Sequence, residues 1–201
     1  MTELLVNFHL LQKKGTESLE TILENLLEQG ETELKIISVF MTKGFEFSRM
    51  KQRVLLYKHR FKKLSFSNPI LKGRRRIRSF AAFLIAEYDL NPAENYFFVG
   101  HGLPGSKNRE YFMLEKALRK QGIINAKVSL LMGKSKDIKG KFSGKKVTVI
   151  PLLISCGRHI TQDIFGEEGS FCAELKSKGF EIEKRIVSLD MSERFKNKFF
   201  L

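Results

Sequence analysis

The sequence predicts an α/β protein of two lobes, each a mainly parallel sheet flanked by helices. Short continuous apolar runs alternate with amphipathic segments along the chain, as expected when crossover helices join parallel strands. The alternation is most regular after Pro92 and less clean before it. We therefore place a lobe at residues 1–90 and another at residues 91–201, with a cleft between them.

The composition is that of an ordinary globular protein. The 201 residues are 42% hydrophobic and 29% charged, which argues against disorder. No apolar run approaches the roughly 18 residues of a membrane span, and the first residues do not have the pattern of a signal peptide. Cys156 and Cys172 are too few for a disulfide framework, which favours a reducing cytoplasm.

The net charge of +14 indicates an anionic partner without choosing one. The excess is spread along the chain, with +6 in residues 1–90 and +8 in residues 91–201. One dense run comprises Arg74, Arg75, Arg76 and Arg78 at the start of a predicted helix, where positive charge opposes the helix dipole. A polyphosphate and a polycarboxylate small molecule both fit such a field. We read the run as a solvated or ligand-facing helix end rather than as an element that binds nucleic acid.

The first half contains fewer regular elements than the second. Leucines at helical spacing followed by Gly30 define a helix at Glu17–Gln29. The other elements expected in this half are a strand at Glu3–Phe8, a strand at Leu34–Met41, a basic helix at Phe47–Lys63, an extended piece at Leu64–Leu71 and a helix at Gly73–Tyr88.

The second half alternates strands and helices. Its expected strands are Tyr96–Val99, Ala126–Met132, Val147–Ile154 and Glu181–Ser188. Its expected helices are Asn108–Gln121, Ser170–Lys178 and Ser192–Phe199. A Lys/Gly-rich loop precedes the third strand, and a long loop containing His159 follows it.

Two histidines follow buried strands. His101 lies between two glycines after the strand at Tyr96–Val99, and His159 follows the strand at Val147–Ile154. If both strands belong to one parallel sheet, both histidines lie at its carboxyl edge, where such sheets bind ligands. The pair then forms a metal site, an acid/base pair or both, with Asp163, Glu167 or Glu168 orienting an imidazole. The alternative is that His101 only caps a turn.

Several enzyme classes lack their motif in this chain. The sequence has no GxxxxGK[ST] phosphate loop, no GxGxxG after its first strand and no GxSxG elbow. Nucleotide-dependent and α/β-hydrolase chemistry are therefore poor fits.

Three stretches resemble one known family. They are FVGHG followed by a helix, the strand from Asn125 that ends at Gly133, and IPLLISCGRHITQDIFGEE. Together with SNPIL at Ser67–Leu71 and, more weakly, GFEF at Gly44–Phe47, they resemble the anaerobic-type sirohydrochlorin cobaltochelatases of the class II tetrapyrrole chelatases.

The resemblance implies a two-lobed chelatase-like fold with a shortened N-terminal lobe, since the family's first glycine-serine loop is not recognisable here. It implies a lyase-class enzyme that inserts a divalent metal, cobalt first and iron or nickel as alternatives, into a sirohydrochlorin-like tetrapyrrole in cobalamin biosynthesis.

The resemblance also assigns roles to residues. His101 and His159 match the family's two histidines and would be metal ligands and proton acceptors. Met132 stands where the family has a glutamate ligand. A thioether is soft and neutral, so it favours Cu(I) or haem iron over Co(II) and accepts no proton. Met132 would also contact the tetrapyrrole. The positive charge of the chain, rather than the resemblance, suggests that Arg74, Arg109 and Arg158, and also Arg75, contact the carboxylates of the tetrapyrrole.

Three functions follow from these observations. The first is a cytoplasmic cobaltochelatase. The second is a tetrapyrrole- or haem-binding protein that has lost chelatase activity, with Met132 and a histidine facing the bound metal. The third is a structural α/β protein that binds nucleic acid through its basic helices. The sequence leaves open whether the chain forms a homo-oligomer.

Overall fold

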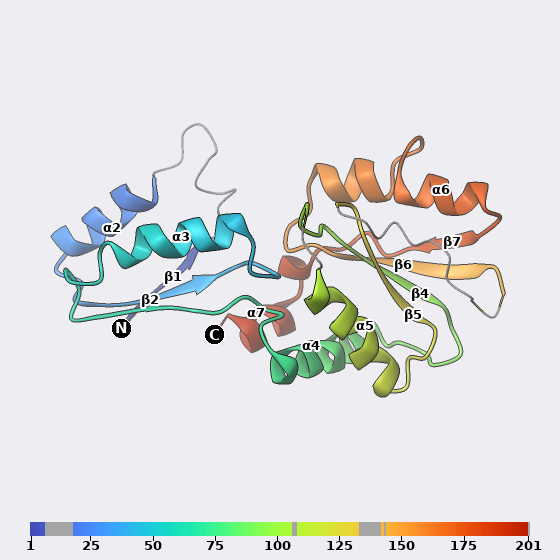
Figure 1. The fold of residues 1–201 in the computed structure, drawn as a ribbon, viewed down its shortest axis with the longest axis horizontal. Helices are drawn as coiled ribbons and strands as arrows, with labels where there is room; N and C mark the ends of the chain where they lie inside the picture. The colour runs from blue at the N-terminus through green and yellow to red at the C-terminus, as the bar shows by residue number, and fades with distance from the viewer. Residues whose placement is uncertain (7–17, 106–107, 133–141, 143, 201) are drawn as a thin grey trace. The chain divides into compact units, whose positions relative to one another are not determined.

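The fold is described from a computed structural model that covers residues 1–6, 18–105, 108–132, 142 and 144–200. The chain divides into two compact units, one formed by Met1–Lys72 and Phe200 and the other by Gly73–Phe199 (Figure 1). The lobe boundary after residue 90 that the sequence suggests stays a prediction. Each unit is described by itself below.

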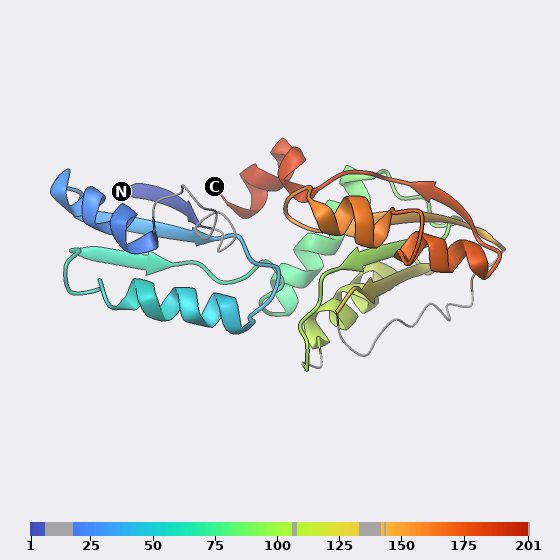
Figure 2. The same cartoon turned by 90° about the horizontal axis from the view of Figure 1, so that it is seen from above.

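The first unit is a three-stranded parallel sheet with two helices on one face. Its strands are β1 (Thr2–Val6), β2 (Glu33–Ser38) and β3 (Lys63–Phe66), in that order across the sheet. Right-handed crossovers between neighbouring strands put both connecting helices on the same face, as Figures 1 and 2 show for α2 (Leu19–Glu28) and α3 (Phe45–Leu55). A buried cluster joins them to the sheet: Leu19 and Leu23 of α2, Leu34 and Ile36 of β2, and Met50 and Val54 of α3.

The helix α3 is shorter than the sequence predicts. The predicted helix runs to Lys63, but α3 ends at Leu55, and turns follow before β3 begins at Lys63. Lys63 belongs to β3, which pairs in parallel with β2, and its N–H donates to the Thr32 carbonyl at 3.2 Å. Strand pairing across the unit thus overrides the local helical pattern.

The second unit contains a four-stranded parallel sheet with the order β5-β4-β6-β7. Its strands are β4 (Tyr96–Gly100), β5 (Ala126–Leu130), β6 (Lys146–Leu152) and β7 (Glu181–Lys184). Its helices are α4 (Arg74–Glu87), α5 (Arg109–Lys120), α6 (Phe171–Ser177) and α7 (Glu193–Phe199), with a short 3-10 turn at Leu189–Met191. In Figure 1, α4 and α5 lie together on one face of the sheet and α6 covers the other.

The strand order creates a topological switch point between β4 and β6. From β4 the chain crosses to β5 on one side, and β6 then lies on the other side of β4 and leads outward to β7. Both central strands are buried on both faces, since all of β4 and all but the first residue of β6 are buried. The pairing of Gly100 with Leu152 brings the carboxyl ends of the two strands level. Ligands bind at such points in open α/β sheets.

A π-helix replaces part of the long loop that the sequence predicts after β6. It spans His159–Ile164, and its Ile160 and Ile164 are fully buried in a cluster with Phe97 and Val99. Single π turns are rare and are often found at functional sites. The burial of two isoleucines four residues apart fixes this turn, which sequence periodicity over so short a segment does not reveal.

The strands of the second unit end somewhat earlier than expected. The structure ends β5 at Leu130, β6 at Leu152 and β7 at Lys184. The predicted extension of the first strand to Phe8, and most of the Lys/Gly-rich loop, lie outside the described residues. In the described part of the chain, no helix is long and apolar enough to span a membrane.

Candidate functional site

The loop after β4 holds the backbone of His101 in place. The N–H of Leu131 donates to the Gly100 carbonyl at 2.9 Å, and the N–H of Met132 donates to the His101 carbonyl at 2.7 Å. Gly102 has a φ of +77°, and a Cβ there would lie 2.3 Å from the Met132 carbonyl oxygen. Only glycine fits this close approach in the left-handed region. The glycine that follows His101 is therefore a structural requirement of the loop.

Two buried side chains support this loop from below. Asn108 has a left-handed backbone and is 4% exposed, and its side chain both accepts from the Leu103 N–H at 2.9 Å and donates to the Leu103 carbonyl at 3.2 Å. Tyr111 packs so closely against the loop that a Cβ on Gly100 would lie 2.6 Å from its ring. Burial raises the pKa of the Tyr111 phenol, against a smaller lowering by a hydrogen bond with the Gly102 backbone.

His159 is positioned by the π-helix. Ile160 and Ile164 of this short helix are buried, so its other side is exposed. His159 and Asp163 are four residues apart on that side, with side chains 50% and 42% exposed. The Nδ1 atom of His159 lies 2.5 Å from the Asp163 Oδ2 atom. The exposed imidazole is thus oriented by one carboxylate.

The structure brings the two imidazoles together. Their ring centroids lie 4.7 Å apart, and the rings are inclined at 71°. The prediction that His101 and His159 meet at one sheet edge is therefore confirmed. They meet because β4 and β6 are direct neighbours and both histidine segments leave the same edge of the sheet.

Hydrogen bonding determines which ring nitrogen is free. The Nδ1 of His101 lies 2.9 Å from the Gly102 carbonyl, which can only accept, so this nitrogen carries the proton. The Nδ1 of His159 lies against the Asp163 carboxylate, whose oxygens accept hydrogen bonds. A neutral imidazole bonded in this way has its lone pair on Nε2, the form that binds metals and accepts protons. Both rings can therefore act as metal ligands or as bases.

The two imidazoles are the candidate metal ligands at this sheet edge. In the described part of the chain, no group of three or more His, Cys, Asp and Glu side chains is arranged to hold a metal ion. Structural metal sites are closed by four protein ligands, whereas reactive sites keep positions open for other ligands. Two imidazoles are two candidate ligands for a metal ion, and their role as metal ligands stays a prediction.

Some of the other predicted binding residues lie on the segments that carry His101 and His159, and one does not. Met132 is joined to His101 through its backbone, and its residue surface is 43% exposed. Arg158 is the residue before the π-helix, Arg109 begins α5 after the His101 loop, and both are exposed. Arg74 is exposed at the start of α4, which packs beside α5 but carries neither histidine. Their binding roles stay predictions.

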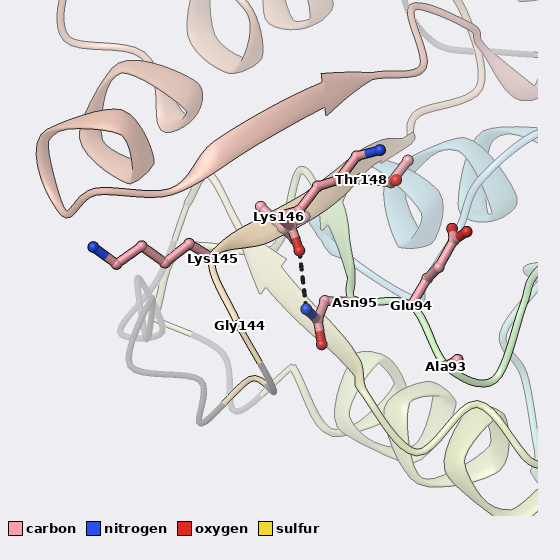
Figure 3. Close-up of a pocket in the computed structure, with 8 residues that line it drawn as sticks. Ala93, Glu94, Asn95, Gly144, Lys145, Lys146 and Thr148 are labelled. Carbon is pink, nitrogen blue, oxygen red and sulfur yellow. Dashed lines mark hydrogen bonds between the residues drawn. The ribbon is translucent and has the colours of Figure 1, made fainter.

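A pocket of about 260 Å³ lies away from the histidines, at the amino ends of β4 and β6 (Figure 3). There Asn95 donates through Nδ2 to the Lys146 carbonyl at 2.9 Å, and its Oδ1 has no partner among the described residues. That oxygen is itself sealed from solvent, so no ligand in the pocket reaches it. In Figure 3 the ammonium groups of Lys145 and Lys146 point away from Asn95. The polar groups of this pocket do not converge on one point.

The sequence indicated both histidines and a set of acids that includes the partner of His159, but not the residues under the His101 loop. Asp163 was one of three acidic candidates, and the structure alone selects it, since neither Glu167 nor Glu168 bonds to an imidazole in the described part of the chain. The i, i+4 spacing of His159 and Asp163 was the available indication. Asn108 and Tyr111 gave no indication, because their role depends on how α5 packs under the loop.

Comparisons with known proteins give a family for this chain. A family model described as "Cobalt chelatase (CbiK)" matches residues 6–201. No curated protein matches the sequence.

Three solved structures share the fold. SirB from Bacillus subtilis with Fe³⁺ gives a TM-score of 0.61 at 17% identity, over 92% of this chain and 75% of that one. The sirohydrochlorin chelatase SirB from Bacillus subtilis subspecies spizizenii in complex with cobalt gives 0.58 at 16% identity, over 92% and 74%. CbiX, described as the terminal enzyme for biosynthesis of siroheme in denitrifying bacteria, gives 0.55 at 17% identity, over 84% and 73%.

Proposed function

The chain belongs to the cobalt chelatase (CbiK) family, and we propose that it inserts a divalent metal ion into a tetrapyrrole. The observation that carries this proposal is the pair of imidazoles 4.7 Å apart at the switch point of the second sheet. His101 and His159 are the proposed metal ligands and the proposed proton acceptors.

The chemistry of insertion calls for such a pair. A metal that enters a tetrapyrrole replaces two pyrrole N–H protons, so the site must offer ligands to the incoming ion and bases for two protons. Two imidazoles with free Nε2 lone pairs supply both roles. As the metal passes to the tetrapyrrole nitrogens, each imidazole is released from it and can take one proton. His159 is half exposed, which gives a proton a direct route to solvent.

Surface charge supports an anionic substrate. Arg109 and Arg158 are exposed on the segments that follow His101 and precede His159, and Arg74 adds charge at the start of α4. Carboxylates on the rim of a tetrapyrrole would be attracted by these cations and form charge-assisted hydrogen bonds with them.

The family and the similar structures support a choice of tetrapyrrole and of metal. We take sirohydrochlorin as the tetrapyrrole and cobalt as the metal, with iron and nickel as alternatives, in cobalamin biosynthesis in the cytoplasm. The description of the family names cobalt, and the two SirB structures hold Fe³⁺ and cobalt. CbiX is described as an enzyme of siroheme biosynthesis, which keeps iron insertion as the main alternative.

A second candidate function is a tetrapyrrole- or haem-binding protein without chelatase activity. Met132 favours it, because this neutral thioether is joined through its backbone to the carbonyl of His101. It would face the bound metal together with a histidine. A thioether ligand suits softer metal states than Co(II).

An anaerobic assay separates these functions. The full chain is mixed with sirohydrochlorin, with and without Co(II), and the absorption spectrum is followed against a protein-free control. Formation of the cobalt product faster than in the control supports the chelatase. A shifted spectrum that needs no metal, without product, supports the binding protein, and an unchanged spectrum contradicts both.

A further inference from the structure

We infer that Asp163 is the positioning residue of His159, and that it selects the imidazole nitrogen that meets the metal. The inference deepens the proposed function and rests on it for the identity of the metal substrate. It begins from the 2.5 Å contact between the His159 Nδ1 and the Asp163 Oδ2.

The two histidines reach the same form by different means. The Nδ1 proton of His101 is held by the carbonyl of Gly102, part of a loop fixed by backbone bonds to Leu131 and Met132. No substitution of a side chain removes that acceptor. His159 depends on one side chain, which lies on an exposed helical turn and is 42% exposed. The orientation of this second ring is therefore open to change by a single mutation.

Asp163 is the only acid of this segment whose carboxylate bonds to the His159 ring in the described part of the chain. The other two acids of the segment, Glu167 and Glu168, are exposed and bond to neither ring. An imidazole released from Asp163 can rotate about its side-chain bonds and can carry its proton on Nε2. In that tautomer the nitrogen that should hold the metal is blocked.

The expected effect is on metal binding rather than on folding. A carboxylate that bonds to a metal-binding imidazole fixes its tautomer, and removal of such a partner lowers metal affinity or activity by about 10–100-fold. The His159–Asp163 pair is half exposed, and exposed pairs of this kind contribute little to stability. Loss of affinity with retained stability is therefore the expected signature.

The test compares four forms of the full-length chain: wild type, Asp163→Ala, Asp163→Asn and the control Glu168→Gln. Long-range ¹⁵N–¹H NMR of the metal-free proteins in mildly alkaline buffer reports which nitrogen of each imidazole carries the proton. The His159 resonances are assigned with His159→Gln. Titration with Co(II) alone then gives the metal affinity, and thermal unfolding checks the fold.

The wild type and Glu168→Gln should show the Nδ1–H form at His159 and equal Co(II) affinity. Asp163→Ala should lose that form at His159 only and bind Co(II) about 10–100-fold more weakly. Asp163→Asn, whose amide oxygen can still accept the proton, should retain the tautomer and bind more tightly than Asp163→Ala. An Nε2–H form at His159 in the wild type overturns the inference without any variant, and so does wild-type affinity in Asp163→Ala.

These readouts do not depend on chelatase activity. If the wild type shows the Nδ1–H form and Asp163→Ala loses it together with Co(II) affinity, the positioning role stands even where no cobalt enters sirohydrochlorin. If cobalt enters sirohydrochlorin in the wild type and the tautomer of His159 does not depend on Asp163, the proposed function stands and the positioning role fails.

Discussion

The segments after β4 and β6 each place a histidine at the same edge of the sheet, but the two segments are held in different ways. The His101 loop is tight, and it is held by backbone hydrogen bonds, a left-handed glycine and two buried side chains beneath it. The His159 segment is an exposed π turn, anchored by two isoleucines and oriented by one carboxylate. The first segment is part of the fold, whereas the second is a surface element attached to it. Substitution of the left-handed glycine in the first segment should therefore lower stability, whereas substitution of the exposed Asp163 in the second should affect metal binding rather than stability.

The largest expected effect comes from removing either imidazole. His101→Ala and His159→Ala should each lower Co(II) affinity by more than about 100-fold, because loss of an outer partner alone costs about 10–100-fold. Calorimetric titration with Co(II) measures both. The double variant should be little worse than either single one. If one single variant kept wild-type affinity, the metal would be held by the other segment alone and the pair would not be the site.

One glycine chosen from each histidine segment tests how tightly the backbone is held beside each histidine. Gly102→Ala places a Cβ 2.3 Å from a backbone oxygen at a φ of +77° and should lower the free energy of unfolding by about 3 kcal/mol. Gly157→Ala in the other segment is the matched control, because a Cβ there meets nothing within 4 Å. It should change stability by less than about 0.5 kcal/mol. Urea unfolding of both variants decides the point, and equal losses would show that the loops do not differ.

Met132 offers a gain of function at the rigid loop. Met132→Glu places a hard, negative oxygen ligand on the residue that is bonded to the His101 backbone. At an effective dielectric constant near 20, a charge about 4 Å from the ion contributes about 4 kcal/mol before desolvation, so a gain of about tenfold in Co(II) affinity is a conservative expectation. Because Met132 is 43% exposed, the carboxylate would not be buried.

Met132→Gln is the neutral control of the same length, and it should bind Co(II) like the wild type. Cobalt insertion should be slow or absent in the wild type and faster in Met132→Glu. If the wild type inserted cobalt rapidly and Met132→Glu inserted it slowly, Met132 would have another role at this position.

The smallest expected effect is that of salt on substrate binding. If Arg109 and Arg158 attract carboxylates, the affinity for sirohydrochlorin should fall by about threefold to tenfold from low to high ionic strength, since screening weakens exposed pairs. Arg109→Gln and Arg158→Gln should each reduce that dependence. Lys120→Gln, at the opposite end of α5 from Arg109, is the control. A binding constant that does not change with salt would leave the arginines without a role in binding.

Patterns in the sequence predicted the central strands of the second unit and the histidines that follow them. The apolar runs at Tyr96–Val99 and Val147–Ile154 predicted strands covered on both faces, and small residues after each predicted a histidine beyond a strand end. The alternation of strands and helices determined that both sheets are parallel. These features are local in the chain, so residue patterns encode them directly.

The tertiary structure decided which strands are neighbours and how each histidine is held. The pairing of β4 with β6 depends on strand order, which no local pattern contains, and it alone brings two rings distant in sequence to 4.7 Å. The π turn is stabilised because Ile160 and Ile164 are buried in the same hydrophobic cluster as Phe97 and Val99. Asp163 rather than Glu167 or Glu168 faces His159 because that turn presents residues four apart on one side. Contacts between distant segments set these features, and a single sequence does not reveal such contacts.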